Sequence, residues 1–296
     1  MKVLVTGGSG FLGSHVADAL SERGHQVILF DRVKSPWLRP DQTMIVGDIL
    51  DGEALRSVVA GCDVVYHMAA LADIGEAMGN PRTAISVNVM GTLTALEAAV
   101  AAGIKRFVFS SSIYVYSSQG SFYRTSKQAC ENLIHDFYDK YNLPYTILRY
   151  GSLYGPRANS GNFIRRVLEQ ALGERRINYG GTGREVREYI HIVDAADASV
   201  DILAAEFENE IVHLTGQERM TSRDVMEMVA EIVGGGVVIE TDERGWPGRY
   251  VQTPYSYTPK IGRKLIRHTY IDLGLGLLDY LEKLHNGGDP PSASGL

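Results

Sequence analysis

The stretch Lys2–Gly13, which reads KVLVTGGSGFLG, decides the fold. In it a short apolar run leads directly into glycines spaced G-x-x-G-x-x-G, at Gly7, Gly10 and Gly13. The first glycine permits a tight turn, the second lets the backbone approach a pyrophosphate at a helix N-terminus, and the third allows close packing of helix on strand. Three glycines alone are weak evidence, but a strand before them and a helix after them predict a dinucleotide-binding turn.

Short apolar runs and longer amphipathic runs alternate through the first 150 residues. The expected strands are Lys2–Val5, Gln26–Phe30, Met44–Val46, Val64–His67, Arg106–Ser110 and Thr146–Arg149. The expected helices are Leu12–Arg23, Gly52–Val59, Ala84–Ala101 and Tyr123–Tyr141. Nearly continuous apolar strands are typical of strands buried on both faces. The alternation predicts an α/β fold, a Rossmann-type doubly wound parallel sheet over residues 1–150.

The pattern changes after Gly151, where glycines and prolines interrupt it. We expect a smaller C-terminal α+β substrate lobe over residues 151–185 and 207–285, with residues 186–206 returning to the first domain. A strand is expected over Tyr189–Val193, with Asp194 capping the helix that follows, and another helix begins after Thr221 or Ser222. Residues 286–296 are rich in Gly, Pro and Ser and are expected to form a disordered tail.

Composition excludes some classes of protein. The chain of 296 residues has a formal net charge of −6 and no long basic run, which argues against a nucleic-acid groove. No signal peptide and no apolar stretch long enough to span a bilayer is recognised. Cys62 and Cys130 are too few for a disulfide framework, so we expect a reducing cytoplasm. Cys130 is interpreted as a packing residue, and no cluster of His or Cys predicts a metal.

An acidic residue ends the second predicted strand, in Phe30-Asp31-Arg32. A carboxylate at this place accepts hydrogen bonds from the ribose hydroxyls of a dinucleotide and repels a 2′-phosphate. Asp31 therefore favours NAD over NADP, although it could simply begin a turn. Arg32 leaves NADP as an alternative cofactor, because a guanidinium could bind the 2′-phosphate.

Tyr123-Arg124-Thr125-Ser126-Lys127 has the pattern Y-x-x-x-K at the start of a predicted helix. The i, i+4 spacing puts Tyr123 and Lys127 on one face. A nearby ammonium and a cationic nicotinamide would lower the phenol pKa from its usual value of about 10 and make Tyr123 a base. Ser112, at the end of a buried strand, could bond the reacting hydroxyl. The plain alternatives are a solvated helix face and serines that satisfy local backbone groups.

The chain resembles the extended short-chain dehydrogenase/reductase family, in its NAD-dependent sugar epimerase/dehydratase branch. The ordered segments that carry this resemblance are Thr6–Gly13, Gly47–Ile49, His67–Ala70, Asn88–Thr92, Ser110–Ser112, Tyr123–Lys127, Tyr154–Arg157 and Arg187–His191. The resemblance implies that Ser112, Tyr123 and Lys127 are catalytic and that NAD stays tightly bound. It also implies a homodimer formed by the helices near residues 85–102 and 123–141.

The glycine turn, Asp31 and the resemblance together assign further contacts. The expected cofactor-binding residues are Gly7, Gly10, Phe11, Leu12, Gly13, Asp31, Arg32, Asp48, Ile49, Met68, Ala69, Ala70, Asn88, Ser110, Tyr123, Lys127 and Tyr150. The expected substrate-binding residues are Ser112, Tyr114, Ser152, Arg187 and Arg249. The resemblance implies that Arg187 contacts the substrate diphosphate. Arg244 and Arg249 are both candidates for a second arginine that binds this diphosphate.

Three departures from the family pattern bear on the substrate. Ile113 and Tyr114 stand where dehydratases and decarboxylating relatives carry a glutamate two positions past the catalytic hydroxyl, which favours an epimerase or a 4-ketoreductase. Only Ser117–Phe122 separates this region from Tyr123, and so short a loop predicts an open pocket. Ser152 replaces an asparagine that usually holds the substrate.

These patterns predict a NAD-dependent nucleotide-sugar epimerase that acts at C4 through a transient 4-keto sugar. One alternative is an NAD(P)-dependent nucleotide-sugar 4-ketoreductase or dehydrogenase. Another is a non-catalytic dinucleotide-binding sensor, although such proteins typically lose the tyrosine or the lysine, and this chain keeps both.

Overall fold

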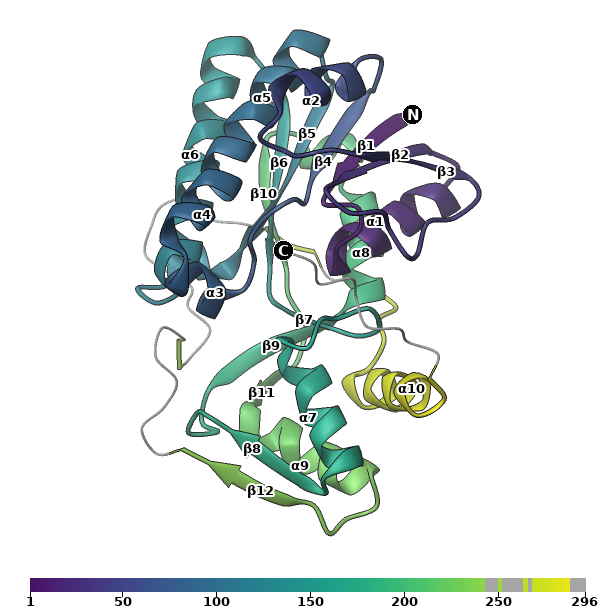
Figure 1. Ribbon diagram of the computed structural model, residues 1–296, viewed down its shortest axis with the longest axis vertical. Helices are drawn as coiled ribbons and strands as arrows, with labels where there is room; N and C mark the ends of the chain where they lie inside the picture. Colours follow the sequence, from purple (N-terminus) through teal and green to yellow (C-terminus); the bar gives the residue numbers. More distant parts are fainter. Residues whose placement is uncertain (243–249, 252–262, 266–267, 288–296) are drawn as a thin grey trace.

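A parallel eight-stranded sheet forms the centre of the computed structural model, which describes residues 1–242, 250–251, 263–265 and 268–287 (Figure 1). The strand order is β13-β10-β6-β5-β4-β1-β2-β3. The strands are β1 Lys2–Thr6, β2 Gln26–Asp31, β3 Gln42–Val46, β4 Val64–His67, β5 Arg106–Ser112, β6 Tyr145–Tyr150, β10 Glu210–Leu214 and β13 Arg263–Lys264. The order reverses between β1 and β4, which places a binding crevice at the carboxyl ends of these strands. The predicted Rossmann-type sheet is confirmed.

Helices cover both faces of the large sheet. They are α1 Phe11–Glu22 and α8 Ile192–Asp201 on one face, and α2 Gly52–Val59, α5 Gly91–Ala102 and α6 Ser121–Tyr141 on the other. The side chains of β1 explain both layers, because successive residues of a strand point to opposite faces. Val3 and Val5 share a core cluster with α1 and α8, whereas Leu4 packs with α2 and α5.

The helix expected over Ala84–Ala101 is composite. Helix α4 (Pro81–Ile85) passes through a π-helical turn, η1 (Ser86–Met90), into α5, and the short α3 (Ile74–Gly79) precedes it. Contrary to the sequence-based expectation, the 22 residues Pro81–Ala102 are long and apolar enough to cross a membrane, with a mean hydropathy of 1.4 over an 18-residue window. Its packing against α2 and α6 offers another reason for this composition, and one such helix is weak evidence for a membrane span.

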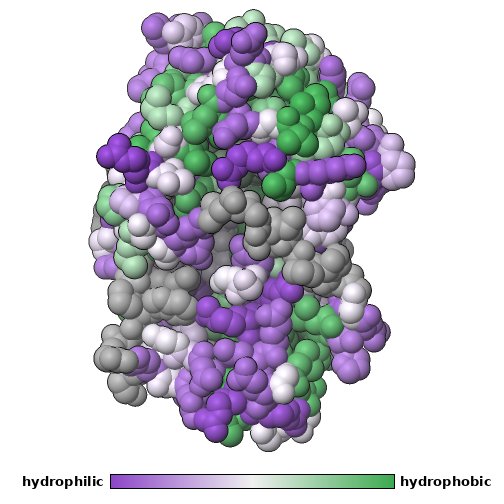
Figure 2. Space-filling model, in the orientation of Figure 1, coloured by the Kyte–Doolittle hydropathy of each residue, from purple (hydrophilic) through white to green (hydrophobic). Residues whose placement is uncertain are grey.

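A smaller lobe lies below the carboxyl ends of the large sheet (Figure 1). It contains a three-stranded sheet of β11, β9 and β7 and a parallel pair of β12 and β8. Its elements are β7 Ser152–Tyr154, α7 Phe163–Gly173, β8 Arg176–Tyr179, β9 Val186–His191, β11 Arg219–Thr221, α9 Ser222–Ile232, β12 Val238–Thr241 and α10 Leu273–His285. A separate core cluster joins α7, α9 and α10. On the surface shown in Figure 2, this lobe is mostly polar, and apolar residues are more frequent above it.

The boundary between the two parts differs from the prediction at two strands. Strand β9 pairs with β7 and β11, so residues 186–191 lie in the lobe, and only α8 returns to the large sheet. Strand β10 pairs with β6 in the large sheet, although residues 207–285 were all assigned to the lobe. A strand of five residues inside a long segment of mixed polarity carries too weak a periodic signal to be assigned from sequence.

Two helix caps test the residue-level predictions. Thr221 caps α9 in a reciprocal capping box with Asp224, as the sequence suggested for Thr221 or Ser222. The prediction that Asp194 caps α8 is wrong, because the strand ends two residues earlier and His191 is the cap. The carboxylate of Asp194 instead accepts a hydrogen bond from the Ile271 backbone N–H at 2.7 Å.

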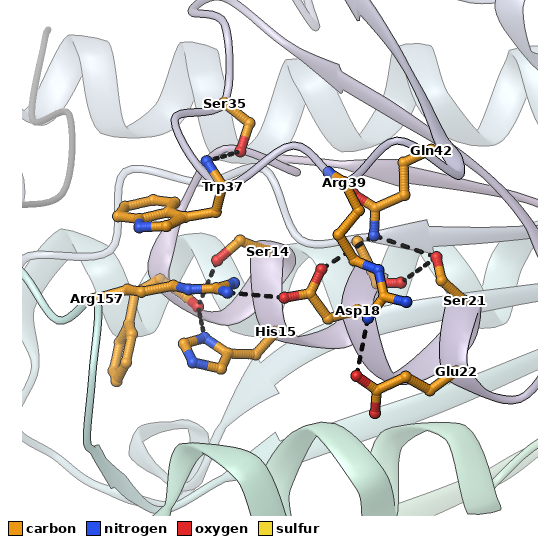
Figure 3. A network of polar contacts seen from close by, with 12 residues as sticks. Ser14, His15, Asp18, Ser21, Glu22, Ser35, Trp37, Arg39, Gln42 and Arg157 are labelled. Atoms are coloured by element: carbon orange, nitrogen blue, oxygen red, sulfur yellow. Dashed lines mark hydrogen bonds and ion pairs between the residues drawn. The ribbon is translucent and has the colours of Figure 1, made fainter. Parts of the chain in front are cut away.

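Arg157 connects the lobe to the nucleotide-binding half (Figure 3). Its guanidinium lies 2.8 Å from the Asp18 carboxylate of α1 and 5.3 Å from the centre of the Trp37 ring, in the segment after β2. The backbone of Arg157 has a φ of 66°, an unfavourable conformation for an arginine that the surrounding contacts must stabilise. This bridge fixes the segment after β7 against α1.

The disordered tail predicted for residues 286–296 lies outside the described residues from residue 288 onward.

Candidate active site

The glycine turn and the end of β4 are in direct contact. Gly7 has a φ of 69°, and a Cβ there would lie 2.6 Å from the Ala69 backbone nitrogen. A Cβ on Gly13 would lie 2.1 Å from the Gly7 carbonyl oxygen. Any larger side chain at either place would push the turn, helix α1 and the segment after β4 apart. The structure therefore brings the expected cofactor residues of the glycine turn together with Met68, Ala69 and Ala70.

Helix α1 offers its N-terminus to an anion. Gly10 is its N-cap, and no side chain caps the helix there. The first N–H groups of a helix have no partner within it, and they carry the positive end of its dipole. The backbone N–H groups at Phe11 and Leu12 can therefore bind a diphosphate without displacing a side-chain cap.

Asp31 lies beside this turn, at the end of β2. Its carboxylate accepts hydrogen bonds from the backbone N–H of Ser9 at 3.0 Å and of Val33 at 3.3 Å. These bonds leave lone pairs on both oxygens for ribose hydroxyls. Asp48 and Arg32 are exposed, and Ile49 is buried against Gly91.

The polar side-chain groups of Asn88 and Tyr150 form hydrogen bonds with other residues of the protein. The Asn88 amide nitrogen donates to the Leu71 carbonyl at 3.1 Å and to Ser126 Oγ at 2.9 Å, and its oxygen accepts from the Leu71 N–H. The Tyr150 hydroxyl lies 2.6 Å from Ser199 Oγ. Both amide hydrogens of Asn88 are engaged, so the geometry gives this residue a positioning role rather than a side-chain donor for a cofactor.

Ser112, Tyr123 and Lys127 meet at the carboxyl end of β5. Ser112 is the last residue of that strand, and Tyr123 and Lys127 lie in the first two turns of α6. The Ser112 side chain lies close enough to the Tyr123 hydroxyl to lower its pKa. The Lys127 ammonium donates to the Ser110 carbonyl at 2.6 Å and lies 5.9 Å from the centre of the Tyr123 ring. The three side chains therefore form one group, as the sequence predicts.

The electrostatics of this group differ from the expectation in one respect. Burial raises the pKa of Tyr123 to about 12, and the Ser112 hydrogen bond only opposes this shift. Burial is the largest cause of the shift, and Lys127 is not among the groups that lower this pKa, contrary to the expectation. Burial also lowers the pKa of Lys127 to about 8, so the ammonium persists at neutral pH.

An aromatic column leads from the group of Ser112, Tyr123 and Lys127 to Arg187 in β9. The Tyr114 and Tyr123 rings lie 6.4 Å apart between centres, and Tyr114 lies 4.5 Å from Tyr250. The Arg187 guanidinium carbon lies 4.0 Å from the centre of the Tyr250 ring. Sequence reasoning missed Tyr250, which directly follows Arg249 and carries no periodic signal. Arg244 and Arg249 lie outside the described residues.

The short loop before Tyr123 is closely held. Gly120 has a φ of 99°, and a Cβ there would lie 2.6 Å from the Tyr114 ring. Arg124 donates to the carbonyls of Ser117 and Ser118 at 3.3 and 2.6 Å. Ser152 lies half-buried at the start of β7. The loop thus packs against Tyr114, and the predicted open pocket stays a prediction.

Comparison with known proteins decides the family. The sequence model of the NAD dependent epimerase/dehydratase family matches residues 3–214, which include the glycine turn, the group of Ser112, Tyr123 and Lys127, and Arg187. The chain belongs to this family. Among the described residues of this family member, no three His, Cys, Asp or Glu side chains are grouped to hold a metal ion.

Several relatives of this family member cover most of its length. A UDP-glucose 4-epimerase from Yersinia pestis is 32% identical over 278 residues, 78% of this chain and 81% of the relative. A UDP-N-acetyl-alpha-D-glucosaminuronate decarboxylase from Bacillus cytotoxicus is 28% identical, over 86% of this chain and 87% of the relative. The structure of the Thermus thermophilus UDP-glucose 4-epimerase in complex with NAD has a TM-score of 0.82 and 25% identity, covering 96% of this chain and 99% of that one.

Proposed function

We propose that this chain is a NAD-dependent nucleotide-sugar epimerase that inverts C4 through a transient 4-keto sugar. The observation that carries the proposal is the group of Ser112, Tyr123 and Lys127 beside the glycine turn. The Yersinia pestis relative and the Thermus thermophilus structure are both UDP-glucose 4-epimerases, which supports the same reaction.

The residues present fit NAD. The open N-terminus of α1 suits its diphosphate, and Asp31 suits the ribose hydroxyls while repelling a 2′-phosphate. The cradle at Gly7 has no room for a Cβ, so the backbone itself can approach the ligand. NAD supplies a hydride acceptor that later returns the hydride to the same carbon.

The chain's own residues move the proton. Tyr123 takes the proton of the C4 hydroxyl through its phenolic oxygen, and the Ser112 hydroxyl holds that oxygen in place. A phenol whose pKa burial raises to about 12 needs a positive charge beside it. The Lys127 ammonium is such a charge, and its remaining N–H groups can bond the nicotinamide ribose.

Arg187 supports a nucleotide-diphosphate substrate. It is 7% exposed and donates a hydrogen bond to the Val186 carbonyl. No carboxylate of the described residues forms an ion pair with this buried guanidinium, so an anionic ligand would stabilise it. The aromatic column through Tyr250 and Tyr114 connects this anion site to the reacting sugar.

Tyr114 favours epimerisation over elimination or decarboxylation. The Bacillus cytotoxicus relative is a decarboxylase, and the family pattern for such enzymes places a glutamate two positions past the catalytic hydroxyl. Here that position holds Tyr114, whose ring packs on Tyr123. Without a carboxylate at this place, the 4-keto sugar has no adjacent base for elimination, and return of the hydride remains.

We also propose that the chain forms a homodimer in the cytoplasm. Exposed apolar side chains lie on the helices expected to pair, including Ile85, Met90 and Phe122. Both cysteines are buried and unpaired, which suits a reducing compartment.

A panel of nucleotide sugars tests the activity directly. The purified chain, with no added cofactor, is incubated with UDP-, GDP-, dTDP- and CDP-linked hexoses, and the products are resolved by chromatography. The proposal predicts a C4 epimer and no net NADH. Turnover only after adding NADH and a 4-keto sugar would instead identify a ketoreductase.

A further inference from the structure

A buried ion pair lies directly beneath the catalytic group. Glu131 follows Lys127 by one helical turn on α6 and is 6% exposed. Its carboxylate accepts two bonds from Arg149 of β6, at 2.9 and 2.5 Å, and a third from the Ser111 hydroxyl of β5 at 2.5 Å. One side chain therefore joins α6 to two neighbouring strands, where Ser111 and Arg149 are register partners.

The contacts of Arg149 extend this junction to the wall of the pocket. Arg149 donates to the Tyr116 hydroxyl, which lies 2.8 Å from His213 Nε2 of β10. Tyr116 ends the 3-10 turn η2, Ile113–Tyr116, that carries Tyr114. The Glu131–Arg149 pair thus contacts the supports of all three parts of the site: Lys127 on α6, Ser112 on β5 and Tyr114 on η2.

Stability alone does not explain such a pair. Removing two charges from water costs several kcal/mol per ion, and apolar residues of similar volume often stabilise a protein as well or better. A charged pair does define one relative placement of the elements that it joins, because its hydrogen bonds are directional.

We propose that Glu131 is a positioning residue for the reaction, which with Arg149 locks α6 to the carboxyl ends of β5 and β6 and so fixes Lys127 relative to Ser112. This inference rests on the proposed epimerase function. The Glu131 carboxylate is engaged by Arg149 and Ser111, so it acts through other residues.

The charge of Glu131 adds a second effect on Lys127. The groups around the ammonium are Tyr123, Cys130 and Glu131 of α6, Phe109 and Ser110 of β5, and His67 of β4. Burial lowers the pKa of Lys127 to about 8, and Cys130 and Glu131 oppose the shift. His67, whose pKa burial lowers to about 3, is neutral at the pH of the reaction. Loss of the Glu131 charge therefore removes an interaction that keeps Lys127 protonated.

Three variants separate positioning from folding. Glu131→Gln keeps the shape and removes the charge. Glu131→Leu with Arg149→Met replaces the pair by apolar side chains that can fold without it. Glu208→Gln is the matched control, because Glu208 pairs with the buried Arg106 at 2.7 Å, at the opposite end of the same strand β5. Each is compared by thermal unfolding, kcat and KM from pH 6 to 9, and NAD affinity by calorimetry at pH 6 and 8.

Glu131→Gln should lower kcat with little change in KM, and the loss should be about fivefold greater at pH 8 than at pH 6 if the pKa of Lys127 falls by about one unit. The loss of NAD affinity in Glu131→Gln, relative to the wild type, should likewise be about fivefold greater at pH 8 than at pH 6. The double variant should fold and bind NAD yet have a reduced kcat, while the control keeps the wild-type profile.

The proposal is overturned if Glu131→Gln and the double variant lower the melting temperature but leave kcat, its pH profile and the pH dependence of NAD affinity as in the control. If the wild-type chain epimerises no nucleotide sugar, the proposed function fails instead. The NAD-affinity comparison still decides the role of Glu131 in that case, because it needs no turnover.

Discussion

Tyr123 is the residue on which the proposed chemistry depends most. Tyr123→Phe removes only the phenolic oxygen and keeps the ring contacts with Tyr114 and Lys127. We expect kcat to fall by about 10²- to 10⁴-fold, the range for a positioned acid–base group, with NAD content and melting temperature unchanged. Steady-state kinetics measure kcat, the ultraviolet spectrum of the purified variant measures its NAD content, and thermal unfolding measures its melting temperature.

Tyr141→Phe is the matched control, since Tyr141 is exposed at the far end of the same helix. Full activity in Tyr123→Phe would contradict the assignment of the base.

The ammonium of Lys127 predicts an alkaline limit to the reaction. Burial lowers its pKa from 10.5 to about 8, so the charged form is present below about pH 8 and is lost as the pH rises through that value. We therefore expect kcat/KM to fall about tenfold per pH unit above this limit. A profile from pH 6 to 10 checks the claim, and a rate that stays constant to pH 10 would show that the charge on Lys127 is not needed.

At the scale of elements, the turn before α6 decides where Tyr114 lies. Gly120→Ala places a Cβ at a φ of 99°, 2.6 Å from the Tyr114 ring. We expect a loss of roughly 1–3 kcal/mol in the free energy of unfolding together with a raised KM for the nucleotide sugar, because the ring must move.

Gly103→Ala provides the comparison for this change. Gly103 also has a positive φ, 63°, but nothing lies within 4 Å of a Cβ there. The Gly103→Ala variant should be less stable than the wild type but have the same KM for the nucleotide sugar. Equal KM values for the two variants would show that Tyr114 does not shape the sugar site.

The sequence predicts elements best where their pattern is local. Helix Gly52–Val59 has the predicted bounds, and β1 and β5 extend only one or two residues beyond the prediction. The glycine turn and the Tyr123–Lys127 pair were also recognisable, because their chemistry depends on fixed spacing along the chain. Each of these features is specified by neighbours in sequence.

Features formed by distant segments were not recognisable in the same way. Glu131 and Arg149 are 18 residues apart and belong to different elements. Tyr250 meets Arg187 only because the lobe folds back, and β10 joins the large sheet only through its pairing with β6. Such contacts are decided by tertiary packing, on which local propensity carries no information.

At the scale of the whole molecule, buried histidines predict sensitivity to acid. Burial lowers the pKa of His15 and His67 to about 3, and of His191 and His213 to about 4. These side chains stay neutral in the folded state but take up a proton in the unfolded state below about pH 6.5. Stability is therefore retained above that pH and is lost as the pH falls from about 6.5 toward 4.

Urea unfolding at pH 7.5, 6 and 5 measures this loss. His213 contacts Tyr116 across the junction of β10 and η2. His213→Asn should reduce the slope of the free energy of unfolding against pH by about 1.4 kcal/mol per pH unit. An unchanged slope would show that His213 is already protonated in the folded protein.

The central claim is that a hydride leaves C4 of a nucleotide sugar and returns to the same carbon. The measurement is incubation of the purified chain, without added cofactor, with the nucleotide sugar identified by the panel, carrying deuterium at C4, followed by mass and NMR analysis of the products. The account predicts the C4 epimer of that nucleotide sugar with the deuterium retained at C4 and no net NADH. Epimer in which the deuterium has been replaced by solvent hydrogen, or deuterium that accumulates in free NADH without an epimer, would contradict it.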